Sequence, residues 1–446
     1  MRLIVRGIFW FGIYITIILF PLIAGAVFFK PEPGIGPLLF LAVSCGYIAL
    51  ALMATELLLV SRFESVAAAF GLDVLLQFHR EAGIASMAFA IAHPVLLVAD
   101  RTYTYSMISP TLNTPLPVLM GPIALTFAVL VVGLSVFRRL LRINYEVWQL
   151  THGLFSIALM GFAAAHVLTV GRFAALPIMR VLWILYLAAF VSIFIRYRVV
   201  RPITLTRKPW EVVENRSELG QSNTVVLKPV GHPGFTFSPG QFGWVGFGKS
   251  PLTSPLHPIS FSSNGDDPTA EGTVAFTIKH LGDWSSDVVP HIEPGARAWI
   301  DGPHGVFSID REEGAGYVFI GGGVGITPLF SMVQALYTRG DVRPVYLFYG
   351  ANETSDLTFG EELLAIAEQM PSFTYVPVIL RPDDNWDGET GFISAEILAK
   401  HLPPLLFRRM QYFICGPTPL MDAMERILPE VGVPADRIHT ERFDMV

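Results

Sequence analysis

Six long apolar stretches in the first 200 residues constrain the fold of this chain more than any other feature. A helix needs about 20 mostly apolar residues to cross a bilayer. The stretches cover residues 8–28, 36–60, 76–99, 118–137, 146–170 and 176–196. The rest reads as ordinary globular sequence, so we predict a multi-domain membrane protein whose residues 1–200 form a six-helix transmembrane bundle.

Basic residues are distributed unevenly between the two sets of connections that these stretches define. If the N-terminus is cytoplasmic, the outer side receives only Lys30, Arg101 and Arg172. The inner side receives Arg2, Arg6, Arg62, Arg138, Arg139, Arg142, Arg196, Arg198, Arg201, Arg207 and Lys208. Because cytoplasmic loops are rich in Lys and Arg, we expect a multi-pass protein of the inner (plasma) membrane with both termini cytoplasmic. Small residues at 24–26 leave open that the first stretch is a signal peptide. The net charge of −6 gives no indication of a nucleic-acid partner.

Four histidines lie in the apolar half, two in the third stretch and two in the fifth. They are His79, His93, His152 and His166, and both intervals (93 − 79 and 166 − 152) are 14 residues. On a helix, such an interval places two side chains on one face, about 21 Å apart. Since both stretches run in the same direction, each leaflet would hold two imidazoles that can ligate one haem iron from both sides. The alternative is that these histidines are polar residues bridging helices.

With these paired histidines, the chain resembles the ferric reductase-like transmembrane family, which includes NADPH oxidases and ferric-chelate reductases. The resemblance implies two haem b groups, with His79 and His152 holding the inner one and His93 and His166 the outer one. Arg80, Arg101 and Arg172 lie at depths where they could meet haem propionates, although a role in snorkelling or topology is equally open.

Residues 205–310 change to short alternating strands separated by Gly and Pro turns, which predicts a small antiparallel β-barrel. The segment 257–263 reads HPISFSS, and its alternate hydroxyls can bond one face of a flavin ring. Lys279 adds a positive charge. Ser285 and Ser286 could cap a helix whose N-terminus would suit a pyrophosphate.

In this order, the segments resemble the flavin domain of the ferredoxin–NADP reductase superfamily, in the form that transmembrane reductases use. The resemblance implies FAD as the cofactor. It also implies FAD contacts by His257, Pro258, Ile259, Ser260, Ser262, Ser263, Lys279, Trp284, Ser285 and, in the C-terminal ending, the aromatic Phe443.

From 315 to 446 strands and helices alternate, which predicts an α/β domain with a parallel sheet. An apolar strand at 317–320 runs into GGGVGITP at 321–328, where we expect Thr327 to cap a helix and Pro328 to start it. A strand, a Gly-rich loop and a helix in this order indicate a dinucleotide site. Its predicted contacts are Gly322, Gly323, Gly325, Ile326, Thr327, Pro328, Arg381, Cys415, Gly416 and Pro417.

Two of these contacts depend on further arguments. The resemblance places the Cys-Gly-Pro segment at 415–417 near the nicotinamide, whereas a plain strand-to-helix turn is the alternative. Arg381 could meet a 2′-phosphate and thus favours NADPH. Leu380 stands where many NADP-using relatives have Ser, so NADH stays open.

The sequence therefore predicts an NAD(P)H oxidase or ferric reductase-type enzyme. Electrons would pass from cytoplasmic NAD(P)H through FAD and two haems to an extracytoplasmic small-molecule acceptor, either dioxygen, giving superoxide, or a ferric chelate. Leu97 stands where animal-type oxidases have a further histidine, so the resemblance does not carry over a dioxygen site. Two other functions stay open: a membrane subunit that reduces a partner protein, and a nucleotide-regulated transporter or proton channel.

Overall fold

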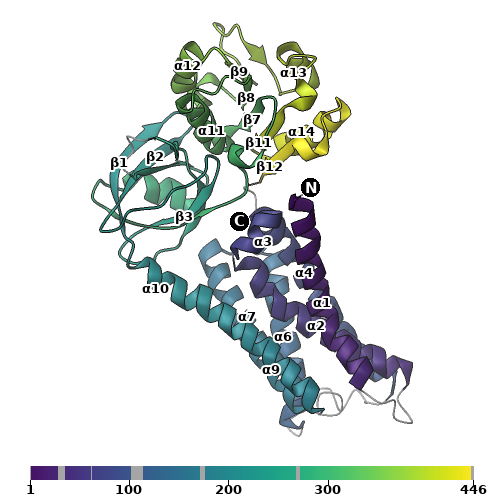
Figure 1. The fold of residues 1–446 in the computed structure, drawn as a ribbon. Coiled ribbons are helices and arrows are strands. Elements are labelled where there is room, and N and C mark those ends of the chain that lie inside the picture. The colour runs from purple at the N-terminus through teal and green to yellow at the C-terminus, as the bar shows by residue number, and fades with distance from the viewer. Residues whose placement is uncertain are drawn as a thin grey trace. The chain divides into compact units, whose positions relative to one another are not determined.

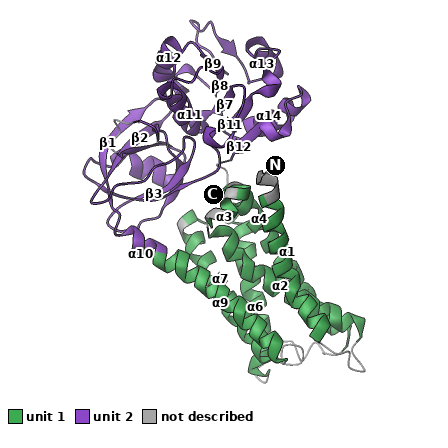
Figure 2. Cartoon of the chain, in the orientation of Figure 1, with its two compact units in different colours: residues 1–200 green, residues 201–446 purple. Residues whose placement is uncertain are grey.

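The structure is a computed structural model that describes residues 2–28, 36–61, 63–101, 114–170, 176–267 and 272–442. It divides into two compact units, residues 1–200 and residues 201–446 (Figures 1 and 2).

The first unit is a bundle of membrane-spanning helices. Among the described residues, six helices are long and apolar enough to cross a bilayer. They are α1 (Arg2–Phe28), α2 (Pro37–Val60), α4 (Leu72–Ala99), α6 (Leu116–Val136), α7 (Tyr145–Thr169) and α9 (Pro177–Phe194). The six-helix prediction is confirmed. A short helix that was not predicted, α3 (Glu64–Phe70), lies between α2 and α4, and η1 (Ile195–Val200) continues α9.

Helix α2 is the most enclosed helix of this bundle. Within the described part of the unit, 61% of its most apolar window is buried, against 11–22% for the other five spans. Its residues Tyr47, Leu50 and Met53 pack with Trp183 of α9 and Ala128 of α6 in one core. A polar group on α2 therefore faces other helices more often than it faces lipid.

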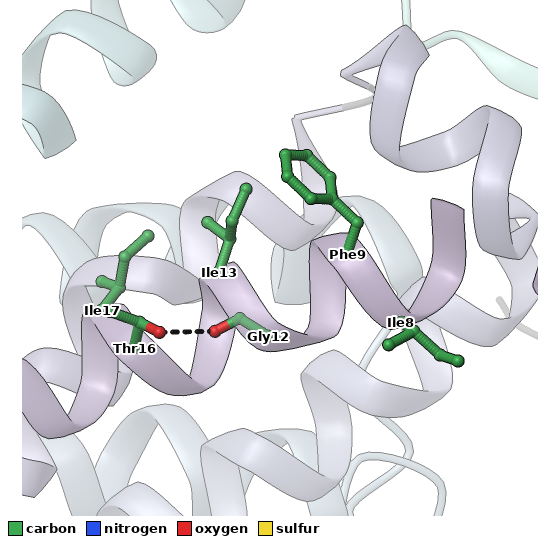
Figure 3. A pocket seen from close by; sticks show the side chains of 6 residues that line it. All are labelled: Ile8, Phe9, Gly12, Ile13, Thr16 and Ile17. Carbon is green, nitrogen blue, oxygen red and sulfur yellow. Dashed lines mark hydrogen bonds between the residues drawn. The ribbon is translucent and has the colours of Figure 1, made fainter. Parts of the chain in front are cut away.

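Helix α1 presents much of its surface outward. A shallow pocket runs along it, lined by Ile8, Phe9, Gly12, Ile13, Thr16 and Ile17 (Figure 3). The Thr16 hydroxyl donates to Gly12 O of its own helix at 2.7 Å, so the pocket presents apolar groups. Such a surface suits contact with acyl chains.

The second unit begins with a curled antiparallel sheet of six strands. Their spatial order is β4-β3-β6-β1-β2-β5. The strands are β1 (Trp210–Glu218), β2 (Ser222–Pro229), β3 (Phe242–Phe247), β4 (His257–Ser260), β5 (Val274–Lys279) and β6 (Arg297–His304). An isolated bridge between Phe261 and Phe276 links the chain after β4 to β5. Trp210, Leu227 and both of these phenylalanines fill the interior of the curl.

A parallel six-stranded sheet follows, in the order β10-β9-β8-β7-β11-β12. Its strands are β7 (Tyr317–Gly322), β8 (Val345–Ala351), β9 (Phe373–Ile379), β10 (Glu389–Thr390), β11 (Gln411–Cys415) and β12 (Ile438–Glu441). Helices α11 (Ile326–Thr338), α12 (Gly360–Gln369), α13 (Ala395–His401) and α14 (Thr418–Glu430) connect them. Separate apolar cores lie on the two faces, one with Phe319 and one with Val318 and Ile320 of β7. The carboxyl ends of β7 and β11 meet, as cofactor sites in such sheets require.

Candidate functional site

The four membrane histidines meet in two pairs, each with one residue from α4 and one from α7. The ring centres of His79 and His152 lie 6.3 Å apart. Those of His93 and His166 lie 6.4 Å apart, and the ring planes cross at 72° in both pairs. The structure thus pairs the first histidine of α4 with the first histidine of α7, and the second with the second.

The outward-facing nitrogen of each histidine shows which tautomer the ring adopts. His93 Nδ1 lies 2.8 Å from Ala42 O of α2, and His166 Nδ1 lies 3.1 Å from Pro117 O of α6. A carbonyl oxygen can only accept, so each Nδ1 carries the proton and donates it. In both residues Nε2 therefore keeps a free lone pair, which is the form that binds a metal.

The same reasoning applies to His152. The Ser135 hydroxyl donates its single proton to Val131 O at 2.6 Å. Its oxygen accepts from Trp148 Nε1 at 3.1 Å and lies 3.1 Å from His152 Nδ1. Because the hydroxyl has no second proton to give, His152 Nδ1 is the donor.

His79 is held by a carboxylate. Its Nδ1 forms an ion pair with Glu56, the only charged residue of α2. A charge without a partner inside a membrane helix is costly, so we expect Glu56 to have a partner. The sequence reasoning missed Glu56, although a lone acid in an apolar span is itself a signal of function.

Two glycines that were also missed let the second histidine pair lie against neighbouring backbone. A Cβ at Gly46 would lie 3.0 Å from His93 Nδ1. A Cβ at Gly121 would lie 2.9 Å from His166 Cε1. Gly46 comes four residues after Ala42, and Gly121 comes four residues after Pro117, which is about one helical turn. Each glycine thus lies next to the carbonyl that accepts from the histidine ring. Both rings therefore reach a helix carbonyl that a larger residue at this position would cover.

Each pair can offer two nitrogen lone pairs to one metal centre. In the ranges that the structure describes, no group of three or more His, Cys, Asp or Glu side chains is placed to hold a metal ion. Two imidazoles therefore suit a metal that brings further ligands of its own. Of the arginines considered for propionates, Arg80 and Arg101 are exposed, and Arg172 lies outside the described residues.

In the curled sheet, the predicted flavin strand is β4. The His257 ring stacks on Trp284, with ring centres 3.9 Å apart and an angle of 21°. Pro258 and Ile259 are half-buried. Ser260 is 2% exposed, and its hydroxyl has no hydrogen-bond partner among the described residues. A buried hydroxyl without a partner is costly, and a polar atom of a flavin would satisfy it.

The next two serines bond within the sheet. Ser262 Oγ accepts from Thr277 Oγ1 at 2.8 Å, and Ser263 Oγ accepts from Ala275 N at 3.0 Å. Their hydroxyls thus hold β5 beside this segment. Phe443, the predicted aromatic cover, lies outside the described residues.

The structure corrects the predicted role of Ser285 as a helix cap. The turn η2 (Trp284–Val288) begins one residue earlier, and its N-cap residue is Asp283. Ser285 Oγ accepts from the N–H groups of Leu281 and Gly282, both at 2.9 Å. The hydroxyl therefore closes the loop before the turn, and the cap prediction was wrong.

The two predicted nucleotide motifs pack together, backbone against backbone. A Cβ at Gly325 would lie 2.2 Å from Cys415 O, and one at Gly416 would lie 3.1 Å from Gly322 N. Pro417 lies 3.1 Å from the Cβ position of Gly322. Only glycines permit this approach. The loop after β7 and the turn after β11 therefore form one surface at the carboxyl ends of these two strands.

Lys279 also reaches this surface. Its Nζ lies 3.8 Å from the Cβ position of Gly323, a residue with φ of +53°. A single ammonium group beside a Gly-rich loop can attract a phosphate. Lys279 was predicted as an FAD contact, and its position links the flavin strand β5 with the nucleotide loop.

The start of α11 differs from the prediction. The helix begins at Ile326, with Gly325 as its N-cap residue, because the turn η5 (Gly323–Gly325) leads directly into it. Thr327 Oγ1 donates to Val324 O at 2.9 Å, so it caps no helix N–H, and Pro328 is the third helical residue. The free N–H groups of the first turn remain available to an anion.

Arg381 and Glu353 form an exposed ion pair at 3.2 Å beyond the ends of β9 and β8. An acid at this edge suits a ribose 2′-hydroxyl, and an arginine suits a 2′-phosphate. On the opposite side of the loop, burial and then the Glu441 carboxylate raise the pKa of the Cys415 thiol well above its usual range. Cys415 therefore stays protonated and contributes shape to the site.

Two family models match parts of the chain. The family model described as ferric reductase like transmembrane component matches residues 45–163, a range that includes His79, His93 and His152. The model described as oxidoreductase NAD-binding domain matches residues 319–426.

The chain is also similar to known reductases. The propane 2-monooxygenase reductase component of Rhodococcus jostii (strain RHA1) is 29% identical over 225 residues, which is 49% of this chain and 58% of that protein. Ferredoxin–NADP reductase B of Sorangium cellulosum (strain So ce56) is 30% identical over 169 residues, 36% of this chain and 67% of that protein.

A likeness in fold extends further along the chain. The crystal structure of flavohemoglobin from Malassezia yamatoensis is 17% identical with a TM-score of 0.50, covering 90% of this chain and 98% of that one. At this identity the likeness concerns the fold alone. The six apolar helices, the curled flavin-type sheet and the nucleotide-type sheet occur here in one polypeptide that binds FAD and NAD(P)H. The chain therefore belongs to the oxidoreductase family in which a ferric reductase-like transmembrane component is fused to a NAD-binding domain of the ferredoxin–NADP reductase type.

Proposed function

We propose that this protein carries electrons from NAD(P)H through FAD and two haem b groups to an acceptor on the opposite side of the membrane. The observation that carries the proposal is the pair of facing histidines at each of two levels of the bundle. An iron held on both sides by imidazole nitrogens at roughly 2 Å places the ring centres about 6 Å apart. The two pairs have separations of 6.3 Å and 6.4 Å.

The protonation of the rings supports the same assignment. All four Nδ1 atoms have an outer partner, which leaves Nε2 of each ring as the ligating atom. A haem held by two of these imidazoles would supply one-electron transfer and would leave no iron position for substrate. The residues of the chain fix the orientation and separation of the two imidazole rings in each pair, and the apolar helices around each pair exclude water.

Each half of the second unit contributes a different step in this proposal. FAD bound to the curled sheet would supply the change from two-electron hydride transfer to single-electron transfer. The buried hydroxyl of Ser260 and the His257 ring on β4 would orient the flavin. The interlocked loops at Gly325 and Gly416, with Lys279 beside them, would bind the nucleotide phosphates.

The orientation of the chain follows from its basic residues. We place both termini and the second unit on the cytoplasmic side of the plasma membrane, because the connections that carry most of the arginines then lie inside. The His79 and His152 pair is then the inner site and the His93 and His166 pair the outer one.

The acceptor in this proposal is a small molecule at the far side, dioxygen or a ferric chelate. Leu97, one turn beyond His93, offers no imidazole to dioxygen. The connection 101–117, which carries Tyr103 and Tyr105, lies largely outside the described residues. Both acceptors are therefore tested directly.

The experiment is an anaerobic absorption spectrum of the purified full-length protein, before and after NADPH and then NADH. We expect b-type haem bands that shift to the reduced form within the time of mixing. Air or ferric chelate is then added, and the acceptor is the one that restores the oxidised spectrum.

A matched variant separates nucleotide binding from haem binding. Gly325→Ala introduces a Cβ only 2.2 Å from Cys415 O, so NAD(P)H should no longer reduce the haems, while dithionite still does. A pigment-free protein would contradict the proposal and favour the transporter or channel. Haems that are reduced but stay reduced with both acceptors would favour a subunit that serves a partner protein.

A further inference from the structure

The two histidine pairs differ in the groups that hold their Nδ1 atoms. At the His93 and His166 level, both partners are backbone carbonyls, which carry no net charge. At the His79 and His152 level, one partner is the Ser135 hydroxyl and the other is the carboxylate of Glu56. Among the described residues, a group that can bear a full negative charge therefore contacts His79 and none of the other three rings.

We propose that Glu56 lowers the reduction potential of the site formed by His79 and His152 below that of the site formed by His93 and His166. This inference rests on the haem ligation proposed above and assigns a direction to it. With haems bound at both sites, this difference would favour transfer of an electron from the His79 and His152 site to the His93 and His166 site.

The physical reason lies in the hydrogen bond at Nδ1. A negatively charged acceptor draws the Nδ1 proton and makes the imidazole a stronger electron donor at Nε2. A stronger donor stabilises the ferric state relative to the ferrous state, because the ferric ion carries the larger positive charge. A neutral carbonyl or hydroxyl does this far less.

The surroundings of Glu56 direct its charge to His79. The side chain is 14% exposed and lies on α2, the most enclosed helix described in the bundle. In the described part of the chain, no Lys or Arg forms an ion pair with Glu56. Tyr14 and Phe78 pack edge to face at 5.1 Å in an apolar cluster that also contains Leu52 and Leu59 of α2. Low polarity around a charge strengthens its effect on a neighbour.

The orientation of the chain gives this difference a use. The last helix of the bundle ends at Val200 and leads into the flavin-type sheet. His79 and His152 lie seven residues after the starts of α4 (Leu72) and α7 (Tyr145), helices that run opposite to α9. They are therefore the pair at the end of the bundle from which the chain continues into the second unit.

The test is a spectroelectrochemical titration of the full chain with both haems bound. Wild type should titrate in two one-electron steps. The step from the His79 site is assigned with His166→Ala, which disrupts the other site. In Glu56→Gln, which keeps the shape and removes the charge, the ferrous-to-ferric ratio of this step at fixed potential should rise about tenfold, because a hydrogen bond to a charged group is stronger than one to a neutral group by roughly this factor. For a one-electron couple this is a rise of about 59 mV.

The matched control is Glu81→Gln, which removes the same charge from an exposed position on α4 only two residues from His79. Its potentials should equal those of wild type. The inference is overturned if Glu56→Gln leaves both steps unchanged, moves only the other step, or behaves as Glu81→Gln does.

A second variant covers the case in which Glu56→Gln loses haem from this site. Glu56→Asp keeps the charge and shortens its reach, so the same step should rise by a smaller amount, and an unchanged or lowered potential would overturn the inference. Failure of haem binding in wild type, by contrast, would contradict the proposed function itself.

Discussion

Replacing Gly121 by Ala should disturb one haem site without disturbing the fold. The added Cβ would lie 2.9 Å from His166 Cε1, 3.1 Å from Nδ1 and 3.3 Å from Nε2. Carbon atoms in contact prefer a separation of about 3.5–4.0 Å, so the ring must move by roughly 0.6 Å or more. The hydrogen bond from His166 Nδ1 to Pro117 O is already 3.1 Å long and would be stretched beyond useful range.

The expected magnitude follows from three opposing effects. Overpacking costs about 1–3 kcal/mol, and loss of the hydrogen bond costs about 1 kcal/mol. The helix gains about 1 kcal/mol when Ala replaces Gly. The net cost of roughly 1–3 kcal/mol falls on the ligand ring, so haem affinity at this site should drop about 10–100-fold, as for other changes to the outer partners of metal ligands.

Gly133→Ala is the matched control, because Gly133 lies on the same helix and its Cβ position has no atom within 4 Å. The assay is the ratio of haem to protein after purification, with the two redox steps resolved by titration. We expect Gly121→Ala to weaken the step from the His93 and His166 site and Gly133→Ala to leave both steps intact. Equal haem content and equal spectra in the two variants would refute the reasoning.

Three further predictions concern the second unit. Ser260→Ala should lower FAD affinity by about tenfold, because a hydroxyl without another partner is lost; fluorescence titration of flavin-depleted protein measures this, and unchanged affinity would remove Ser260 from the site. Arg381 and Glu353 form a 3.2 Å ion pair at the site proposed for the ribose. Arg381→Ala removes the partner of a 2′-phosphate and should shift the ratio of kcat/KM values toward NADH by about tenfold or more, whereas Glu353→Gln weakens the contact with a 2′-hydroxyl and should shift this ratio toward NADPH. Equal ratios in wild type and both variants would contradict this. Burial lowers the pKa of His439 to about 4 in the folded chain. The unfolded chain binds the proton near pH 6.5, so this stabilisation is complete above that pH and is lost as the pH falls toward 4, by up to about 3 kcal/mol. His439→Gln should therefore show a smaller fall in the free energy of unfolding between pH 7 and 4.5, measured by hydrogen exchange in β12, and an identical fall would contradict the assignment.

The broad architecture could be predicted because it depends on local pattern. Each span of the bundle is an apolar run long enough to be recognised alone, and the glycine loop after β7 lies between a strand and a helix. The seven-residue helix α3 was missed because it is too short to cross a membrane. The start of α11 was misplaced because a Gly-rich sequence does not distinguish a loop from a tight turn that leads into the helix.

The histidine pairs could be proposed from their interval alone, but not the groups that hold them. Glu56 and Gly46 lie on α2, and Ser135 and Gly121 lie on α6. Their contacts with α4 and α7 depend on which helices are neighbours and how these are rotated, and a single sequence does not reveal either. The acid in an apolar span was visible, whereas its partner was not. The pairing of Gly325 with Cys415 is hidden for the same reason, since the residues adjoin only through the parallel strands β7 and β11.

The most direct test of the account is the haem content of wild type and of the four variants His79→Ala, His152→Ala, His93→Ala and His166→Ala. The account predicts two haems per wild-type chain. It predicts that His79→Ala and His152→Ala lose the same redox step, and that His93→Ala and His166→Ala lose the other. A wild type without haem, or variants whose losses do not group in these pairs, would contradict the account.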